Sequence, residues 1–223
     1  MIIKHLQLET GKLIEQRKFY LQQLGFAPLE DHADGFTFKA GHSRLSFRAS
    51  PGHACYHFAF NIPSDAEDAA LDWLQKRVEV LSFRGKPAVD FPNWNAKAIY
   101  FRDPAGNVVE FIARRDLERK LEGDFSAGNI LGISEVGLPV CGVHAHFHQL
   151  HTGLGIKKYW GEGEEFCAAG DEQGLFIIVD RSTKEWFPTD MPANPFPLEA
   201  TVAVGEHTHL LQFDGECLDI AAN

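Results

Sequence analysis

The chain repeats one pattern of secondary structure, and this repeat limits the folds that it can adopt. His5-Leu6-Gln7-Leu8 and His57-Phe58-Ala59-Phe60 open similar alternating runs, and the two histidines stand 52 residues apart. Each run is followed by helix-type spacing and then by further alternating runs, which gives the order βαβββ. A repeat of about 50 residues is typical of a duplicated supersecondary unit. The sequence therefore predicts an α+β protein built from βαβββ modules.

Two such modules fill the first half of the chain, and a third and a reduced fourth fill the second half. The first module has a strand over 2–9, a helix between Thr10 and Gly25, and strands near 36–40 and 44–49. The second has a strand over 55–62, a helix opened by Ser64 and Glu67 as a capping box, and strands near 78–83, 97–102 and 108–113. The third has a strand over 133–140, a helix over 143–152 and strands near 157–160, 165–168 and 175–179, with a hairpin turn at 170–174. After a Pro-rich loop over 188–197, strands are expected near 199–204, 210–213 and 217–220.

We expect two tandem domains. Residues 1–115 form the first, with two paired modules, and 130–223 form a second, degenerate one. The charged segment 116–129 is predicted to link them.

Composition narrows the classes of ligand. The chain has 223 residues, 44% of them apolar, and a net charge of -10 without a block of Lys and Arg. A nucleic-acid or anionic membrane partner is therefore not expected, and a small molecule is. The sequence starts directly with a strand pattern and has no apolar run of membrane-spanning length, so we expect a cytoplasmic protein. Its four cysteines are dispersed, which predicts reduced thiols.

Three side chains on predicted strands suggest a metal site. Alternation places His5 with Gln7 and Glu9 on one face of the first strand, and His57 likewise shares a polar face of its own strand. Two imidazoles and the carboxylate of Glu110 form a ligand set used for Fe(II) and related ions. The ordinary alternative is that this polar face meets water.

The modules resemble the vicinal oxygen chelate superfamily, which includes glyoxalase I, bleomycin resistance proteins and extradiol dioxygenases. The resemblance is carried by His5-Leu6-Gln7-Leu8, by Lys18 to Phe26, by Tyr56 to Phe60, and above all by Tyr100-Phe101-Arg102-Asp103-Pro104-Ala105-Gly106-Asn107-Val108-Val109-Glu110-Phe111. It implies paired modules that curl into half-barrel sheets around a divalent metal, with His5, His57 and Glu110 at the ligand positions. Fe(II) or Mn(II) is favoured, with Zn or Ni as further choices.

The resemblance also orders the candidate reactions. Ser46 stands where glyoxalase I-like members place an acidic ligand, so a three-ligand site with open positions is expected, and this favours extradiol-dioxygenase-like chemistry. The alternatives are a glyoxalase-like lyase or isomerase, and a bleomycin-resistance-like protein that only binds a small molecule. Members that cleave catechols carry a histidine before the tyrosine, whereas this chain has Asn93, unless His32, His42 or His53 reaches in.

Further residues are predicted around this site. Tyr100 is the candidate acid or hydrogen-bond donor, and Arg44, Ser46, Arg48, Asn93 and Trp94 are candidate substrate-binding residues. Arg44 and Arg48 can equally be solvated, and Trp94 can belong to the core. Glu135 takes the position in the third module that His5 has in the first, and we interpret the second domain as a structural partner that can also cap the cavity. A homo-oligomer is compatible with the sequence.

Overall fold

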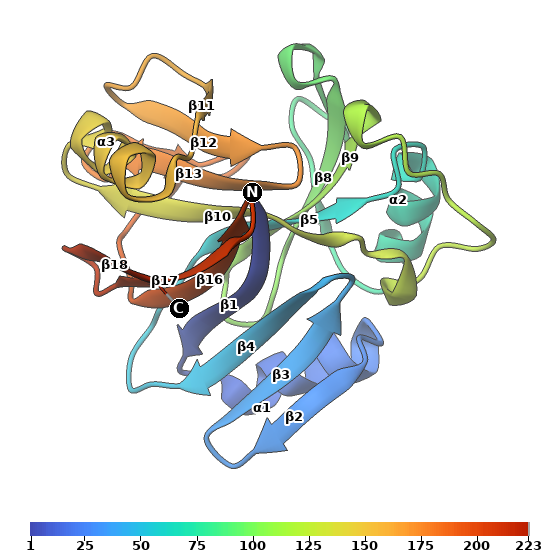
Figure 1. The fold of residues 1–223 in the computed structure, drawn as a ribbon. Helices are drawn as coiled ribbons and strands as arrows, with labels where there is room; N and C mark the ends of the chain where they lie inside the picture. The colour runs from blue at the N-terminus through green and yellow to red at the C-terminus, as the bar shows by residue number, and fades with distance from the viewer. Residues whose placement is uncertain (223) are drawn as a thin grey trace.

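The computed structural model describes residues 1–222, and it contains three complete modules and a reduced fourth (Figure 1). Module 1 comprises β1 (Ile2–Thr10), α1 (Leu13–Arg17) with a π-helical continuation (Lys18–Gln23), β2 (Pro28–His32), β3 (Gly35–Ala40) and β4 (Ser43–Ala49). Module 2 comprises β5 (His57–Ile62), α2 (Glu67–Gln75), β6 (Val80–Leu81), β7 (Val89–Phe91), β8 (Ala96–Arg102) and β9 (Val108–Arg114). Module 3 comprises β10 (Gly132–Val140), α3 (Val143–Leu154), β11 (Lys158–Trp160), β12 (Phe166–Asp171) and β13 (Gly174–Asp180). A short hairpin of β14 (Glu185–Trp186) and β15 (Met191–Pro192) precedes β16 (Leu198–Val204), β17 (His207–Phe213) and β18 (Leu218–Ala222) of module 4. The predicted fold class is confirmed.

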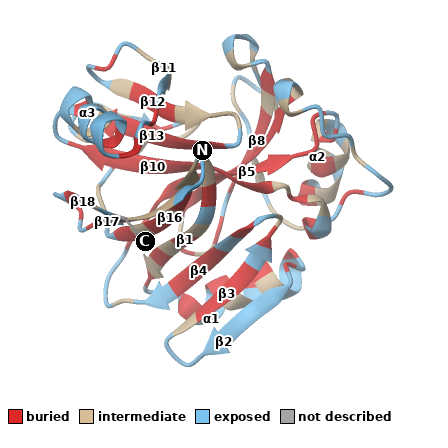
Figure 2. Ribbon diagram, viewed as in Figure 1, coloured by how far each residue is buried: buried red, intermediate tan, exposed pale blue. Residues whose placement is uncertain are grey.

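The alternation of β5 divides its side chains between two apolar clusters. Along β5, Phe58 and Phe60 belong to the large cluster that includes Ala70 and Leu74 of α2. Ala59, between them, belongs to a smaller cluster on the opposite face of the sheet, together with Tyr100, Ile112, Ile177 and Trp186. All six residues of β5 are buried, as the red ribbon in Figure 2 shows. A strand that is covered on both faces can place polar side chains away from bulk water.

The modules pair as first with fourth and second with third. β1 pairs with β4 in parallel and with β16 antiparallel, while β5 pairs with β9 in parallel and with β10 antiparallel. We call β1–β4 with β16–β18 sheet 1/4, and β5–β13 sheet 2/3. The two sheets meet at the pair of Ile3 with Ile133. The sequence predicted that the first two modules pair with each other within 1–115. In the structure, the first strand of each pairs instead with a strand on the other side of the predicted linker.

Local structure differs from the expectations at the start of α2. The helix begins after Ala66 without a side-chain cap, and the Ser64 hydroxyl instead donates a 2.9 Å hydrogen bond to the carbonyl oxygen of Arg119. The Leu121 N–H donates to Asp65 at 2.9 Å. The predicted capping box is therefore wrong. The side chains of Ser64 and Asp65 instead hold the 116–129 segment against the module. The hairpin turn at 170–174 is confirmed between β12 and β13.

Two further observations concern the whole chain. All four cysteines are free, with Cys55 and Cys167 buried and Cys141 and Cys217 exposed. Among residues 1–222, none of the helices has the length and apolar character needed to cross a membrane.

Candidate metal centre

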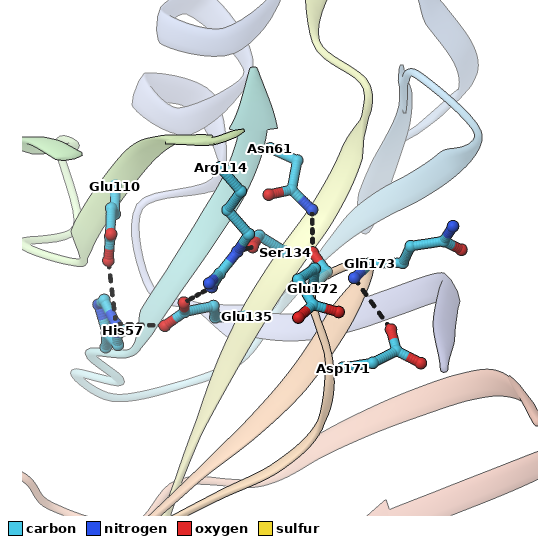
Figure 3. Close-up of polar contacts among 9 residues, drawn as sticks. All are labelled: His57, Asn61, Glu110, Arg114, Ser134, Glu135, Asp171, Glu172 and Gln173. Atoms are coloured by element: carbon cyan, nitrogen blue, oxygen red, sulfur yellow. Dashed lines mark hydrogen bonds and ion pairs between the residues drawn. The ribbon is translucent and has the colours of Figure 1, made fainter. Parts of the chain in front are cut away.

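Three strands of sheet 2/3 bring His57, Glu110 and Glu135 together (Figure 3). Ala59 of β5 pairs with Glu110 of β9 on one side and with Glu135 of β10 on the other. His57 precedes Ala59 by two residues, so its imidazole lies on the same face. Its Nε2 is 3.7 Å from an oxygen of Glu110 and 3.9 Å from an oxygen of Glu135. The three donor atoms all lie within 4.8 Å of one another.

The backbone sets the tautomer of His57. Nδ1 lies 3.1 Å from the carbonyl oxygen of Val108. A carbonyl oxygen only accepts, so in the neutral imidazole Nδ1 carries the hydrogen and Nε2 carries the lone pair. Nε2 faces the two carboxylates, which is the orientation that a metal-binding imidazole needs.

The two carboxylates are held in an unfavourable electrostatic position. Glu110 and Glu135 are each 3% exposed. Burial, followed by the charge of Glu135, raises the pKa of Glu110 well above its ordinary value, while Arg114 and Tyr100 oppose the rise. Like charges this close destabilise one another unless a cation lies between or beside them. Positive charge nearby therefore stabilises the pair.

Arg114 supplies part of this positive charge. Its side chain is completely buried, forms an ion pair with Glu135 through Nη2, and donates from Nε to the hydroxyl of Ser134 at 3.3 Å. The guanidinium also lies over the rings of Trp94 and Tyr159, at 5.2 and 5.9 Å from their centroids. These contacts fix the orientation of the Glu135 carboxylate and leave its other oxygen directed at His57.

The donor set fits a divalent ion. Metal–ligand bonds of about 2.1 Å at right angles separate neighbouring donors by about 3 Å, so the two distances from His57 Nε2 to the carboxylate oxygens, 3.7 and 3.9 Å, would shorten by less than about 1 Å on binding. Two carboxylate oxygens and one imidazole suit Mn(II), Fe(II) or Mg(II). The position on β13 that corresponds to Glu110 is Ile177, since Gly137 pairs with Ile177 as Ala59 pairs with Glu110. The protein thus offers three ligands, and further coordination positions would stay open.

A cavity of about 260 Å³ lies over these residues. Six aromatic side chains contribute to its wall: Phe91, Trp94, Tyr100, Phe166, Trp186 and Phe187. The ring centroid of Trp186 lies 5.1 Å from that of His57. Gly137 makes room for this indole, because a Cβ there would lie 2.4 Å from Trp186 Cη2. The centre therefore opens into an aromatic chamber of small-molecule size.

The structure separates His5 from this centre. His5 Nε2 hydrogen-bonds the Ser46 hydroxyl at 2.6 Å and lines a different hollow, in sheet 1/4, together with Arg48. Arg44 is exposed on β4 beside His5. Among the predicted ligands, only His57 and Glu110 come together, and Glu135 takes the place given to His5. The physical reason is the pairing of modules, which puts β10 rather than β1 beside β5.

The other predicted residues divide between the cavity and the surface. Tyr100 pairs in register with Glu110 and lines the cavity, as does Trp94. Burial, followed by the carboxylates of Glu110 and Glu135, raises the pKa of the Tyr100 hydroxyl well above its ordinary value. Asn93 is exposed and lines a neighbouring surface hollow. Of the histidines in the part of the chain that is described, only His57 lines the metal cavity.

Sequence reasoning missed two members of the centre, Glu135 and Arg114. The signal for Glu135 was its place in an otherwise almost wholly apolar run from Ile133 to Val140, which the structure buries along its whole length. A carboxylate in such a strand needs a partner. Arg114, at the end of β9, is that partner.

The fold and the centre define a class of protein: an α+β chain of paired βαβββ modules with a buried His-Glu-Glu cluster beneath an aromatic cavity. No family model matches the sequence, and no curated protein matches it. Solved structures do. A protein from Bacillus subtilis subsp. subtilis str. 168, assigned by name as a dioxygenase, matches over 100% of this chain and 84% of its own, with 16% identity and a TM-score of 0.62.

Other solved structures match one half of the chain. A lactoylglutathione lyase from Agrobacterium tumefaciens covers 49% of this chain and 90% of its own, with 23% identity and a TM-score of 0.42. A glyoxalase/bleomycin resistance protein/dioxygenase from Nocardioides covers 51% of this chain and 83% of its own, with 26% identity and a TM-score of 0.41. The full-length likeness shows the fold, and the chain has the fold expected for the vicinal oxygen chelate superfamily.

Proposed function

We propose that this protein is a divalent-metal-dependent enzyme that binds a small oxygenated substrate in the aromatic cavity, with His57, Glu110 and Glu135 as the metal ligands. The observation that carries the proposal is the convergence of these three donors beneath a cavity of about 260 Å³. A bound divalent ion would act there as a Lewis acid that polarises and aligns two neighbouring substrate oxygens. Mn(II) and Fe(II) are favoured, because two of the three donors are carboxylate oxygens.

The residues of the chain would orient the substrate and exclude water. Trp94, Phe166 and Trp186 offer apolar surfaces on which a planar molecule can stack. Ile177, where a fourth ligand would stand, contributes an apolar contact and leaves room for substrate oxygens. The aromatic surroundings also strengthen the electrostatic contacts of the buried carboxylates.

Tyr100 is the candidate proton donor. Its raised pKa keeps the hydroxyl protonated at neutral pH, and its position opposite Glu110 places it at the cavity wall. A hydroxyl in that state donates a hydrogen bond to a developing negative charge on a substrate oxygen. No histidine other than His57 lines the cavity among the described residues, so this role falls to the tyrosine.

Dioxygenase-like chemistry is our first assignment, because an ion held by three protein ligands would have positions left for substrate oxygens and dioxygen. A lyase or isomerase is the second, and the observation that favours it is the oxygen-rich donor set, which also suits ions without redox chemistry. A protein that only sequesters its ligand is the third. Its support is the absence of an acid–base histidine from the cavity lining in residues 1–222.

Turnover separates these assignments. Protein loaded with Mn(II) or Fe(II) is assayed for oxygen uptake with aromatic compounds that bear adjacent oxygens, and for isomerisation of thiol adducts of 2-oxoaldehydes. Glu135→Gln serves as the matched control, because it keeps shape and removes the charge. Oxygen uptake that is lost in the control supports the dioxygenase. Ligand-induced thermal stabilisation without turnover in either assay supports a binding protein and contradicts the proposed enzyme.

A further inference from the structure

Sheet 1/4 repeats the strand register that builds the metal centre in sheet 2/3. In sheet 2/3, Ala59 lies between Glu110 and Glu135. In sheet 1/4, Gln7 of β1 pairs with Ser46 of β4 and with Glu199 of β16. The strand types are also the same, since each first strand has a parallel neighbour on one side and an antiparallel neighbour on the other. Position 7 is therefore the structural counterpart of position 59.

This correspondence assigns a counterpart to every ligand of the metal centre. His5 precedes Gln7 by two residues, as His57 precedes Ala59. Glu199 takes the place of Glu135, and Ser46 takes the place of Glu110. Two of the three donor types are thus retained in sheet 1/4, and one carboxylate is replaced by a hydroxyl. Figure 1 shows β1, with β4 on one side and β16 on the other.

Internal hydrogen bonds occupy the donors of this second group. The hydroxyl of Ser46 bonds His5 Nε2 at 2.6 Å and the Thr37 hydroxyl at 2.8 Å. The Gln7 amide donates to Glu199 at 3.2 Å. In the metal centre, the corresponding residue is Ala59, which has no polar group to offer and leaves the space between the carboxylates free. A neutral alcohol is a weak ligand, and a side-chain amide beside the glutamate takes the place of a cation.

We propose that sheet 1/4 contains a latent divalent-metal site, formed by His5 and Glu199 and closed by Ser46 and Gln7. In the wild-type protein the hydrogen bonds of Ser46 and Gln7 close this site to metal, and exchanging these two residues for those of sheet 2/3, Ser46→Glu and Gln7→Ala, opens it. The expectation of one ion per wild-type chain rests on the proposed function. The opening of the second site does not, because it depends only on the residues of sheet 1/4.

The surroundings of Ser46 can accommodate the new charge. Arg44 and Arg48 lie two residues before and two residues after Ser46 on β4. Burial, followed by the charge of Arg44, lowers the pKa of the His5 imidazole. Glu30 and Glu199 act on His5 in the opposite direction. His5, Gln7 and Glu199 are half-buried, whereas the ligands of the first centre are buried. We therefore expect the opened site to bind metal more weakly than the first.

The experiment counts bound Mn²⁺ in variants that lack the first centre. His57→Ala provides the background, and calorimetric titration with MnCl₂ and elemental analysis after desalting give the stoichiometry. The variant H57A/Q7A/S46E should bind one Mn²⁺ per chain, and the additional change His5→Ala should abolish that binding. The matched control H57A/Q7A/S46Q has the same size without a carboxylate, and it should bind none.

Several outcomes would overturn the proposal. One is the absence of Mn²⁺ from H57A/Q7A/S46E in protein whose circular dichroism matches that of H57A. Should the glutamate prevent folding, H57A/Q7A/S46D carries the same charge on a shorter side chain, and absence of binding there has the same meaning. Another is Mn²⁺ bound by H57A itself and lost on His5→Ala, which would mean that the site is already open. Failure of the proposed function is recognised separately, as wild-type protein that binds no Mn²⁺.

Discussion

Replacement of Arg114 by methionine should destabilise the metal-free protein strongly. The guanidinium is completely buried, pairs with Glu135 and bonds Ser134, and Glu135 itself is 3% exposed. Removing one partner of a buried ion pair leaves the other charge without compensation, at a cost of about 3–5 kcal/mol. For a chain of this size, that corresponds to a fall in melting temperature of about 10 °C. A bound Mn²⁺ supplies positive charge to the same carboxylates, so the deficit should shrink in its presence.

The assay is thermal unfolding of wild type and R114M in EDTA and in excess MnCl₂. Arg115→Met is the matched control, because Arg115 is adjacent in sequence but 37% exposed, and its ion pair with Glu67 lies near the surface. An exposed pair of this kind contributes about 1 kcal/mol or less. If R114M melts in EDTA within the range of R115M, the account of a buried, charge-compensated centre is wrong.

Three further predictions concern the cavity and its ligands. Gly137→Ala should displace Trp186 and lower the free energy of unfolding by about 1–3 kcal/mol, because the new Cβ overlaps the indole. Thermal unfolding measures this loss, and adding Trp186→Phe should restore part of it. Ile177→Asp should tighten Mn²⁺ binding in calorimetry while reducing turnover, because it fills an open coordination position; unchanged affinity would contradict the assignment of the fourth position. Apparent affinity for Mn²⁺ should fall by up to about tenfold per pH unit below the raised pKa of Glu110, because the metal must displace the proton of that carboxyl group. Calorimetric titrations in buffers of different ionisation enthalpy should show the release of this proton. An affinity that does not change with pH would contradict the prediction.

The sequence predicted the modules well because their signals are local. Alternation along residues 57–62 and the turn before Val108 define β5 and β9, and the same strands carry His57 and Glu110. Both ligands follow from period-2 geometry within one module. The residues alone were therefore enough to predict the strands, their order inside a module and the resemblance to known metal sites.

The pairing of modules was not available in this way. Each module opens with a strand, and nothing local in these strands shows whether β5 has β1 or β10 as its neighbour. Pairing β5 with β1 predicts His5 as the third ligand, whereas the observed pairing with β10 brings Glu135 to that place. The two residues occupy the same position in their modules. Partner choice depends on side chains distant in sequence, such as Arg114, whose buried charge pairs with Glu135. The division into 1–115, 116–129 and 130–223 stays a prediction about chain segments, whereas the sheets combine modules from both sides of it.

The measurement that tests the central claim most directly is the metal content of two single variants, Glu135→Gln and His5→Ala, purified without a histidine tag and reloaded with MnCl₂. Each removes a ligand under one assignment of the centre and leaves the other assignment intact. The structure predicts that E135Q loses bound Mn²⁺ and that H5A keeps one ion per chain. Retention of Mn²⁺ by E135Q together with its loss from H5A would contradict the His57, Glu110 and Glu135 centre.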